Sequence, residues 1–85
     1  MTPEEIDALV AANVRAARAR LRLRQQDLAD LVGWSRPTVS ALEAGTRRIT
    51  LADTVALCEA LKLDLAELLR GAPNEVLQSL GLTAS

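Results

Sequence analysis

The sequence predicts an all-α protein, a compact bundle of five or six short helices, on the grounds of composition, helix caps and apolar spacing. Leucine and alanine, both strong helix formers, supply 31 of the 85 residues, whereas the β-branched valine and isoleucine number eight. Trp34 is the one aromatic residue, so the core must be aliphatic. A chain of this length can bury roughly 63% of its surface, which is enough for one domain over residues 1–85.

The first helix is expected to begin almost at the N-terminus. Thr2 can cap it, Pro3 suits its first turn, and Glu5 stands three residues after Thr2, as in a capping box. Apolar residues then recur at helical spacing along one face, at Ile6, Val10, Val14, Ala17 and Leu21.

A second and a third helix should follow, with a tight turn between them. The second runs from about Gln25 to Val32 and ends at Gly33, a residue suited to the left-handed conformation after a helix. Ser35 caps the third helix, which tolerates Pro37 in its first turn and stops at Gly45. The residues expected to face inward are Leu28, Leu31, Val32, Val39 and Leu42.

Cap patterns also place the remaining helices. Thr50 with Asp53 begins the fourth, Asp64 with Glu67 begins a short fifth that ends at Gly71, and residues 75–80 form a last turn or two. The apolar face of the fourth helix is expected to comprise Val55, Leu57, Cys58 and Leu61.

The net charge of −1 conceals an uneven distribution. Residues 15–48 hold eight arginines against three acids, a balance of +5, while residues 1–14 and 49–85 each carry −3. A basic block between acidic ends is the electrostatic pattern of a nucleic-acid contact. The alternative is an arginine-rich composition whose side chains are only solvated.

Several classes of protein are excluded by composition. No run approaches the ~18 consecutive apolar residues of a membrane span, and the acidic start does not resemble a signal peptide. The single Cys58 suits a reducing cytoplasm, and the absence of histidine argues against a metal site. With no histidine, no tyrosine and no enforced carboxylate pair, we expect neither an enzyme nor a cofactor.

The most specific stretch is QQDLADLVGWSRPTVSALEAG, from Gln25 to Gly45. Two short helices meet at Gly33 and Trp34, and small Ala29 allows their close approach, which is the pattern of a helix-turn-helix. The stretch resembles the Cro-repressor-like (XRE, lambda-repressor-like) DNA-binding family, and the resemblance extends over about residues 14–69. The sequence departs from the family's pattern in several places. Arg24 replaces a capping Ser or Thr, Trp34 an aliphatic turn residue and Ile49 a common Pro, while Pro37 and Ala41 stand where family members often have polar base-contacting residues.

The resemblance implies that the third helix lies in the major groove of double-stranded DNA. Arg36 would then make the bidentate contact to guanine, and the other base-facing residues would be Pro37, Thr38 and Ala41. The residues expected at phosphates are Arg24, Gln25, Ser35, Ser40, Arg47 and Arg48. Each also has a plainer interpretation, as a helix cap or a solvated charge.

The resemblance also predicts an ion pair between Arg18 and Glu43 that joins the first helix to the end of the third. A homodimer on a two-fold operator is expected, because two readers double the sequence that is read. Residues 73–82 are a candidate extra helix or dimerisation tail. The residues expected at the dimer contact are Leu63, Leu65, Leu69, Val76, Leu77 and Leu80.

The leading functional hypothesis is a sequence-specific transcriptional regulator, a repressor of phage type or a restriction–modification controller. The alternative is an antitoxin that binds a toxin protein and represses its own operon. The identity of the neighbouring genes would separate these settings.

Overall fold

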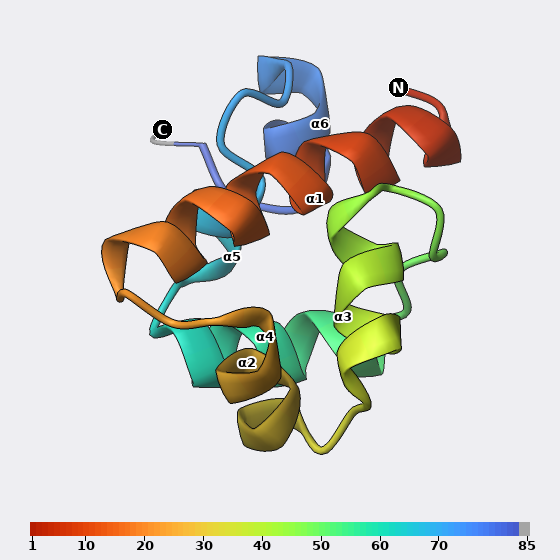
Figure 1. The fold of residues 1–85 in the computed structure, drawn as a ribbon. Coiled ribbons are helices and arrows are strands. Elements are labelled where there is room, and N and C mark those ends of the chain that lie inside the picture. The colour runs from red at the N-terminus through yellow and green to blue at the C-terminus, as the bar shows by residue number, and fades with distance from the viewer. Residues whose placement is uncertain (84–85) are drawn as a thin grey trace.

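The computed structural model describes residues 1–83 and confirms an all-α fold with six helices in that range, so residues 84–85 of the predicted domain lie outside it. Figure 1 shows α1 lying across the other helices, with α2 and α3 meeting at a tight corner. The helices are α1 (Pro3–Arg20), α2 (Gln25–Val32), α3 (Arg36–Glu43), α4 (Leu51–Leu61), α5 (Leu65–Leu68) and α6 (Asn74–Ser79).

Reciprocal caps explain where three of the helices begin. The Thr2 hydroxyl accepts from the Glu5 N–H at 3.1 Å, and the Glu5 carboxylate accepts from the Thr2 N–H at 2.8 Å. The same exchange begins α4 at Thr50 and α5 at Asp64. Each cap satisfies N–H groups that lack a partner within the first turn, so these starts are encoded locally, as predicted.

The core is aliphatic and is formed by the facing sides of α1 to α5. α1 packs against α3, α4 and α5, while α2 packs between α3 and α4. Leu28, Leu42 and Leu57 are fully buried, and each such side chain stabilises the fold by about 1.5–3 kcal/mol. The core residues are Val10, Val14, Ala17, Leu28, Ala29, Val39, Leu42, Leu57, Leu61, Leu68 and Leu69.

Three residues expected to face inward are exposed instead: Leu21 at 43%, Leu31 at 59% and Val55 at 53%. Leu21 lies just beyond the end of α1, where the helical stripe no longer applies. Val55 is two residues from buried Leu57, which places it on nearly the opposite side of α4. Leu31 is likewise two residues from buried Ala29, so it points away from the buried side of α2.

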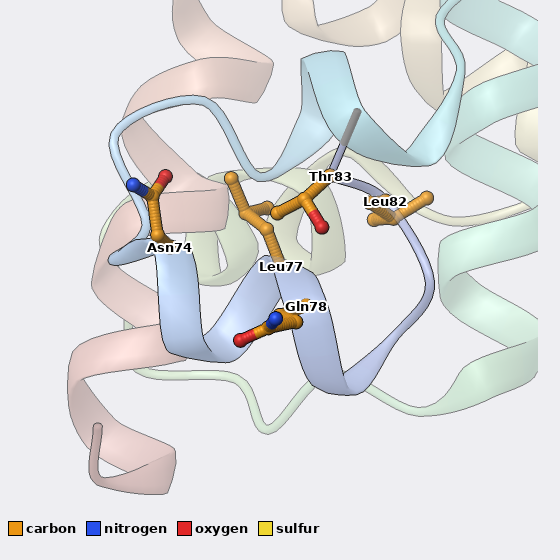
Figure 2. Close-up of a pocket in the computed structure, with 5 residues that line it drawn as sticks. All are labelled: Asn74, Leu77, Gln78, Leu82 and Thr83. Carbon is orange, nitrogen blue, oxygen red and sulfur yellow. The ribbon is translucent and has the colours of Figure 1, made fainter. Parts of the chain in front are cut away.

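The C-terminal segment returns to the core through α6. Leu77 and Leu82 are partly buried and pack against the core, and the Leu82 N–H donates to the Leu77 carbonyl at 2.8 Å. Figure 2 shows these two leucines lining a shallow pocket with Asn74, Gln78 and Thr83. The residue range predicted for this helix, 75–80, is therefore correct to within one residue at each end. No helix within residues 1–83 has the length and apolar character needed to cross a membrane.

Candidate nucleic-acid interface

The turn between α2 and α3 sets the direction of the third helix. Gly33 has φ +74°, a left-handed conformation that a side chain would strain, and it is the C-cap of α2. The Trp34 N–H then donates to the Ala29 carbonyl at 2.9 Å, and its half-buried ring packs against the core. Ser35 follows at once as the N-cap of α3, where its hydroxyl accepts from the Thr38 N–H at 3.4 Å.

One face of α3 is buried and the opposite face is open to solvent. Val39, Leu42 and Glu43 are buried against the rest of the protein. Because helical residues three or four apart share a face, Pro37, Ser40 and Ala41 lie together on the side opposite the buried one, whereas Arg36 stands in the first turn on the same side as Val39 and Glu43. Arg36, Pro37 and Ser40 are nevertheless exposed, and Thr38 and Ala41 are partly buried.

Arg18 and Glu43 form a two-pronged ion pair that joins α1 to the end of α3. The Arg18 Nε donates to Glu43 Oε2 at 2.7 Å and its Nη2 to Oε1 at 3.0 Å. Glu43 is 4% exposed and Arg18 23%, so the carboxylate is buried while the guanidinium keeps some contact with water. The hydrogen bond to Glu43 is the main reason that the pKa of Arg18 lies above its usual value.

Gln25 extends this pair into a chain of polar contacts that reaches the start of α3. Its amide nitrogen donates to Glu43 Oε1 at 3.2 Å, and its amide oxygen accepts from the Arg36 Nη1 at 3.4 Å. Sequence reasoning assigned Gln25 only to a phosphate. The cross-helix contact was missed because residues 18 and 11 positions apart show no local periodicity.

Asp27 holds the N-cap residue Arg24 at the start of α2, where no hydroxyl caps the first-turn N–H groups. Its carboxylate accepts from the Arg24 backbone N–H at 2.8 Å and from the Arg24 guanidinium at 2.9 and 3.1 Å. The bonds from the Arg24 side chain and backbone hold the pKa of Asp27 below its usual value. Arg24 remains 82% exposed, so its guanidinium lies at the surface beside the start of α2.

The loop between α3 and α4 holds the two remaining predicted phosphate contacts, and both have acidic partners. Arg47 donates through Nη2 to both oxygens of Asp53, at 3.2 and 3.3 Å. Arg48 lies 2.9 Å from the Asp7 carboxylate and 3.3 Å from that of Glu4. Asp7 is 6% exposed and also accepts from the Ile49 N–H at 3.2 Å.

The role of Asp7 was not predicted from the sequence. The available signal was its spacing: Asp7 stands three residues before Val10 and seven before Val14, on the apolar face of the first helix, where a carboxylate needs a partner. Its partners lie about 40 residues further along the chain, in a loop that only the fold brings to α1.

Comparison with known proteins agrees with this geometry. A family model described as helix-turn-helix matches residues 14–68. The chain belongs to the XRE-type helix-turn-helix family. The matched range agrees with the predicted resemblance over residues 14–69 and contains the whole of α2 and α3. The chain accordingly carries a helix-turn-helix DNA-binding domain.

Two curated relatives and one solved structure are similar to this XRE-type chain. It is 31% identical over 67 residues to the HTH-type transcriptional regulator YqaE of Bacillus subtilis, covering 79% of this chain and 58% of YqaE. It is 33% identical over 73 residues to the control protein C.SmaI of Serratia marcescens, covering 84% of this chain and 87% of C.SmaI. The crystal structure of the hypothetical transcription factor NHTF from Neisseria aligns with a TM-score of 0.73 and 30% identity, covering 93% of this chain and 91% of that one.

Proposed function

We propose that the protein is a homodimeric repressor that binds a two-fold operator and serves as a controller of the restriction–modification type. The observation that carries this proposal is the solvent face of α3, which leaves Arg36, Pro37 and Ser40 open while its inward face is locked into the core. The likeness to control protein C.SmaI over 87% of its length favours the controller setting. The proposed role is binding in the cytoplasm, without catalysis.

Base recognition on this proposal depends mainly on Arg36. It is the one long polar side chain among the residues expected to face bases, and its guanidinium can donate to guanine O6 and N7 together. Pro37, Thr38 and Ala41 offer only short contacts, such as those to a thymine methyl group. One guanine per half-site should therefore carry much of the specificity, with DNA shape supplying the rest.

Phosphate contacts flank the reading helix. The first N–H groups of α2, with Gln25 and exposed Arg24 beside them, form a site of partial positive charge. The other proposed contacts are Ser35 at the start of α3, Ser40 on its exposed face and Arg48 in the loop beyond its end. Such contacts orient the protein on the duplex without selecting sequence.

The proposed dimer contact lies on the apolar surface at α4 and the C-terminal segment. Leu51 is 79% exposed and Leu80 50% exposed, and both line an apolar cleft that reaches Ile6 and Leu65. Leu69, by contrast, is 7% exposed within a single chain, and Leu63, Leu65 and Leu77 pack against the same core. Leu80, which was predicted, and Leu51, which was not, therefore offer more surface to a second copy than Leu63, Leu65, Leu69 and Leu77.

The direct test is selection of preferred duplexes from a random library, followed by binding measurements on the selected and a scrambled duplex. Arg36→Ala should lower the preference between them by about 1–3 kcal/mol per half-site. Arg70→Ala is the matched control, because it removes one exposed arginine far from α3 in the sequence. The proposal fails if the wild type selects no sequence, or if Arg36→Ala keeps the full preference.

A further inference from the structure

Arg47 lies between two elements that the helix-turn-helix must hold together. Its Cζ is 4.9 Å from the centre of the Trp34 ring, and its Nη2 donates to both carboxylate oxygens of Asp53. Trp34 belongs to the turn that begins α3, whereas Asp53 lies in the first turn of α4. A single side chain therefore connects the start of the reading helix to the start of the next one.

The two neighbouring loop arginines differ in how free they are to meet DNA. Arg48 is 61% exposed: it meets the buried Asp7 carboxylate through Nε, while its Nη2 meets only the exposed Glu4 carboxylate. Arg47 is 35% exposed, and its Nη2 end is the one that holds the buried Asp53 carboxylate. The Nε of Arg47 is buried and has no hydrogen-bond partner among residues 1–83. Asp53 is only 10% exposed at its side chain, so pulling Arg47 away would leave a buried carboxylate without its cation.

We infer that Arg47 is a positioning residue that holds Trp34, and with it the capped start of α3, against α4 and makes no contact with DNA. This inference rests on the proposed function, because the element that Arg47 positions is the proposed reading helix. The inference also gives the two neighbouring arginines different roles, because Arg48 keeps the proposed phosphate contact and Arg47 does not.

The arrangement depends on the shape of the guanidinium as well as on its charge. A planar guanidinium can stack on an indole face and donate to a carboxylate at the same time. A lysine ammonium keeps the charge and binds phosphate, but it cannot reproduce both contacts. Lysine at position 47 therefore distinguishes positioning from phosphate binding.

The experiment compares Arg47→Ala, Arg47→Lys and Arg48→Ala with the wild type. Trp34 is the one tryptophan, so its fluorescence without DNA reports directly on the contact with Arg47. The second measurement is affinity for the selected and the scrambled duplex at several salt concentrations. Thermal unfolding is recorded for each variant, so that loss of folding is recognised.

Both Arg47 variants should shift the Trp34 emission to longer wavelength and lower the preference for the selected duplex by about three- to thirtyfold. Neither variant should change the salt slope, which is the slope of log affinity for DNA against log salt concentration. Arg48→Ala should leave the emission unchanged and lower the slope by about one, as expected for one lost phosphate contact.

Three results would overturn the inference. The first is unchanged Trp34 emission in Arg47→Ala. The second is a salt slope lowered by about one in Arg47→Ala together with a return to the wild-type slope in Arg47→Lys, which would make Arg47 a phosphate contact. The third is a lower unfolding temperature with an unchanged preference, which would make Arg47 a structural brace only. If the wild type shows no preference for the selected duplex, the proposed function is contradicted. The Trp34 emission still tests the contact between Trp34 and Arg47 in that case.

Discussion

At the scale of single residues, Glu43 is the acceptor that ties the reading helix to the rest of the protein. Its carboxylate accepts from two nitrogens of Arg18 and from the amide of Gln25, and it is 4% exposed. A buried carboxylate is tolerated only when such donors replace the lost water. The orientation of α3 therefore depends on Arg18, which is not among the proposed DNA contacts, as well as on Gln25, which is.

Arg18→Ala should lower the free energy of unfolding by about 3–5 kcal/mol, because it leaves the buried Glu43 carboxylate without its cation. Glu43→Ala should cost less, about 1–3 kcal/mol, since Arg18 can reach water. Urea denaturation measures both, with exposed Arg20→Ala as the control. A loss below about 1 kcal/mol for Arg18→Ala would contradict a buried pair.

Glu4→Gln should strengthen DNA binding by about two- to fivefold, because the Glu4 carboxylate competes with phosphate for Arg48. Glu5→Gln is the matched control: it removes the same charge one residue away, from an acid that is bonded to Thr2. Binding titrations in an Arg48→Ala background complete the test, because there the Glu4 carboxylate has no Arg48 to compete for. Equal effects of the two substitutions would indicate general repulsion instead of a contact.

At the scale of elements, helix starts are specified by short-range bonds, and α2 begins with such bonds although its N-cap residue has no hydroxyl. Asp27 accepts from the backbone N–H and the guanidinium of Arg24, where a family member usually has a hydroxyl. The carboxylate also carries a negative charge at the positive end of the helix. The start of α2, which is a proposed phosphate site, therefore depends on an ionised aspartate.

The stability contributed by Asp27 should be lost in acid. Its pKa is lower in the folded protein than in the unfolded chain, so its contribution is fully present above the unfolded pKa and disappears as pH falls through the folded pKa. Urea denaturation over a pH series should show a smaller acid loss in Asp27→Asn than in the wild type. Asp30→Asn, which removes an acid from the same helix, is the control.

At the scale of the whole molecule, the fold leaves an apolar surface that a single chain does not cover. Leu51 and Leu80 stand beside a cleft lined almost entirely by aliphatic residues, on elements outside the helix-turn-helix. A two-fold contact there would pair two reading helices on one duplex.

We expect a homodimer whose reading helices lie about 34 Å apart, one turn of B-DNA. Leu51→Glu should make the protein monomeric and weaken binding to the selected duplex, while the folded chain survives because Leu51 is 79% exposed. Leu31→Glu, at a 59% exposed leucine on α2, is the control. Sedimentation that finds a wild-type monomer at tens of micromolar, with and without DNA, would contradict the dimer.

Much of the fold was predictable from local signals. The caps at Thr2, Thr50 and Asp64 placed the starts of three helices, and the turn at Gly33 the end of α2, to within about a residue, whereas α5 ends at Leu68, short of the predicted end at Gly71. The outward positions of Leu31 and Val55 were not predictable in the same way. Which apolar side of a short helix is covered depends on how neighbouring helices cross it, and the sequence contains no local signal for this.

The sequence by itself determined the helices, the helix-turn-helix and its family, because caps, turn glycines and apolar spacing act over a few residues. It also indicated the set of arginines near the reading helix. Only the tertiary structure decided their partners: Arg48 with Asp7, Arg47 with Asp53 and Trp34, and Gln25 with Glu43. These contacts join different elements, across as many as about 40 positions, and side-chain charge favours a partner of opposite sign without specifying which one the packed helices bring within reach.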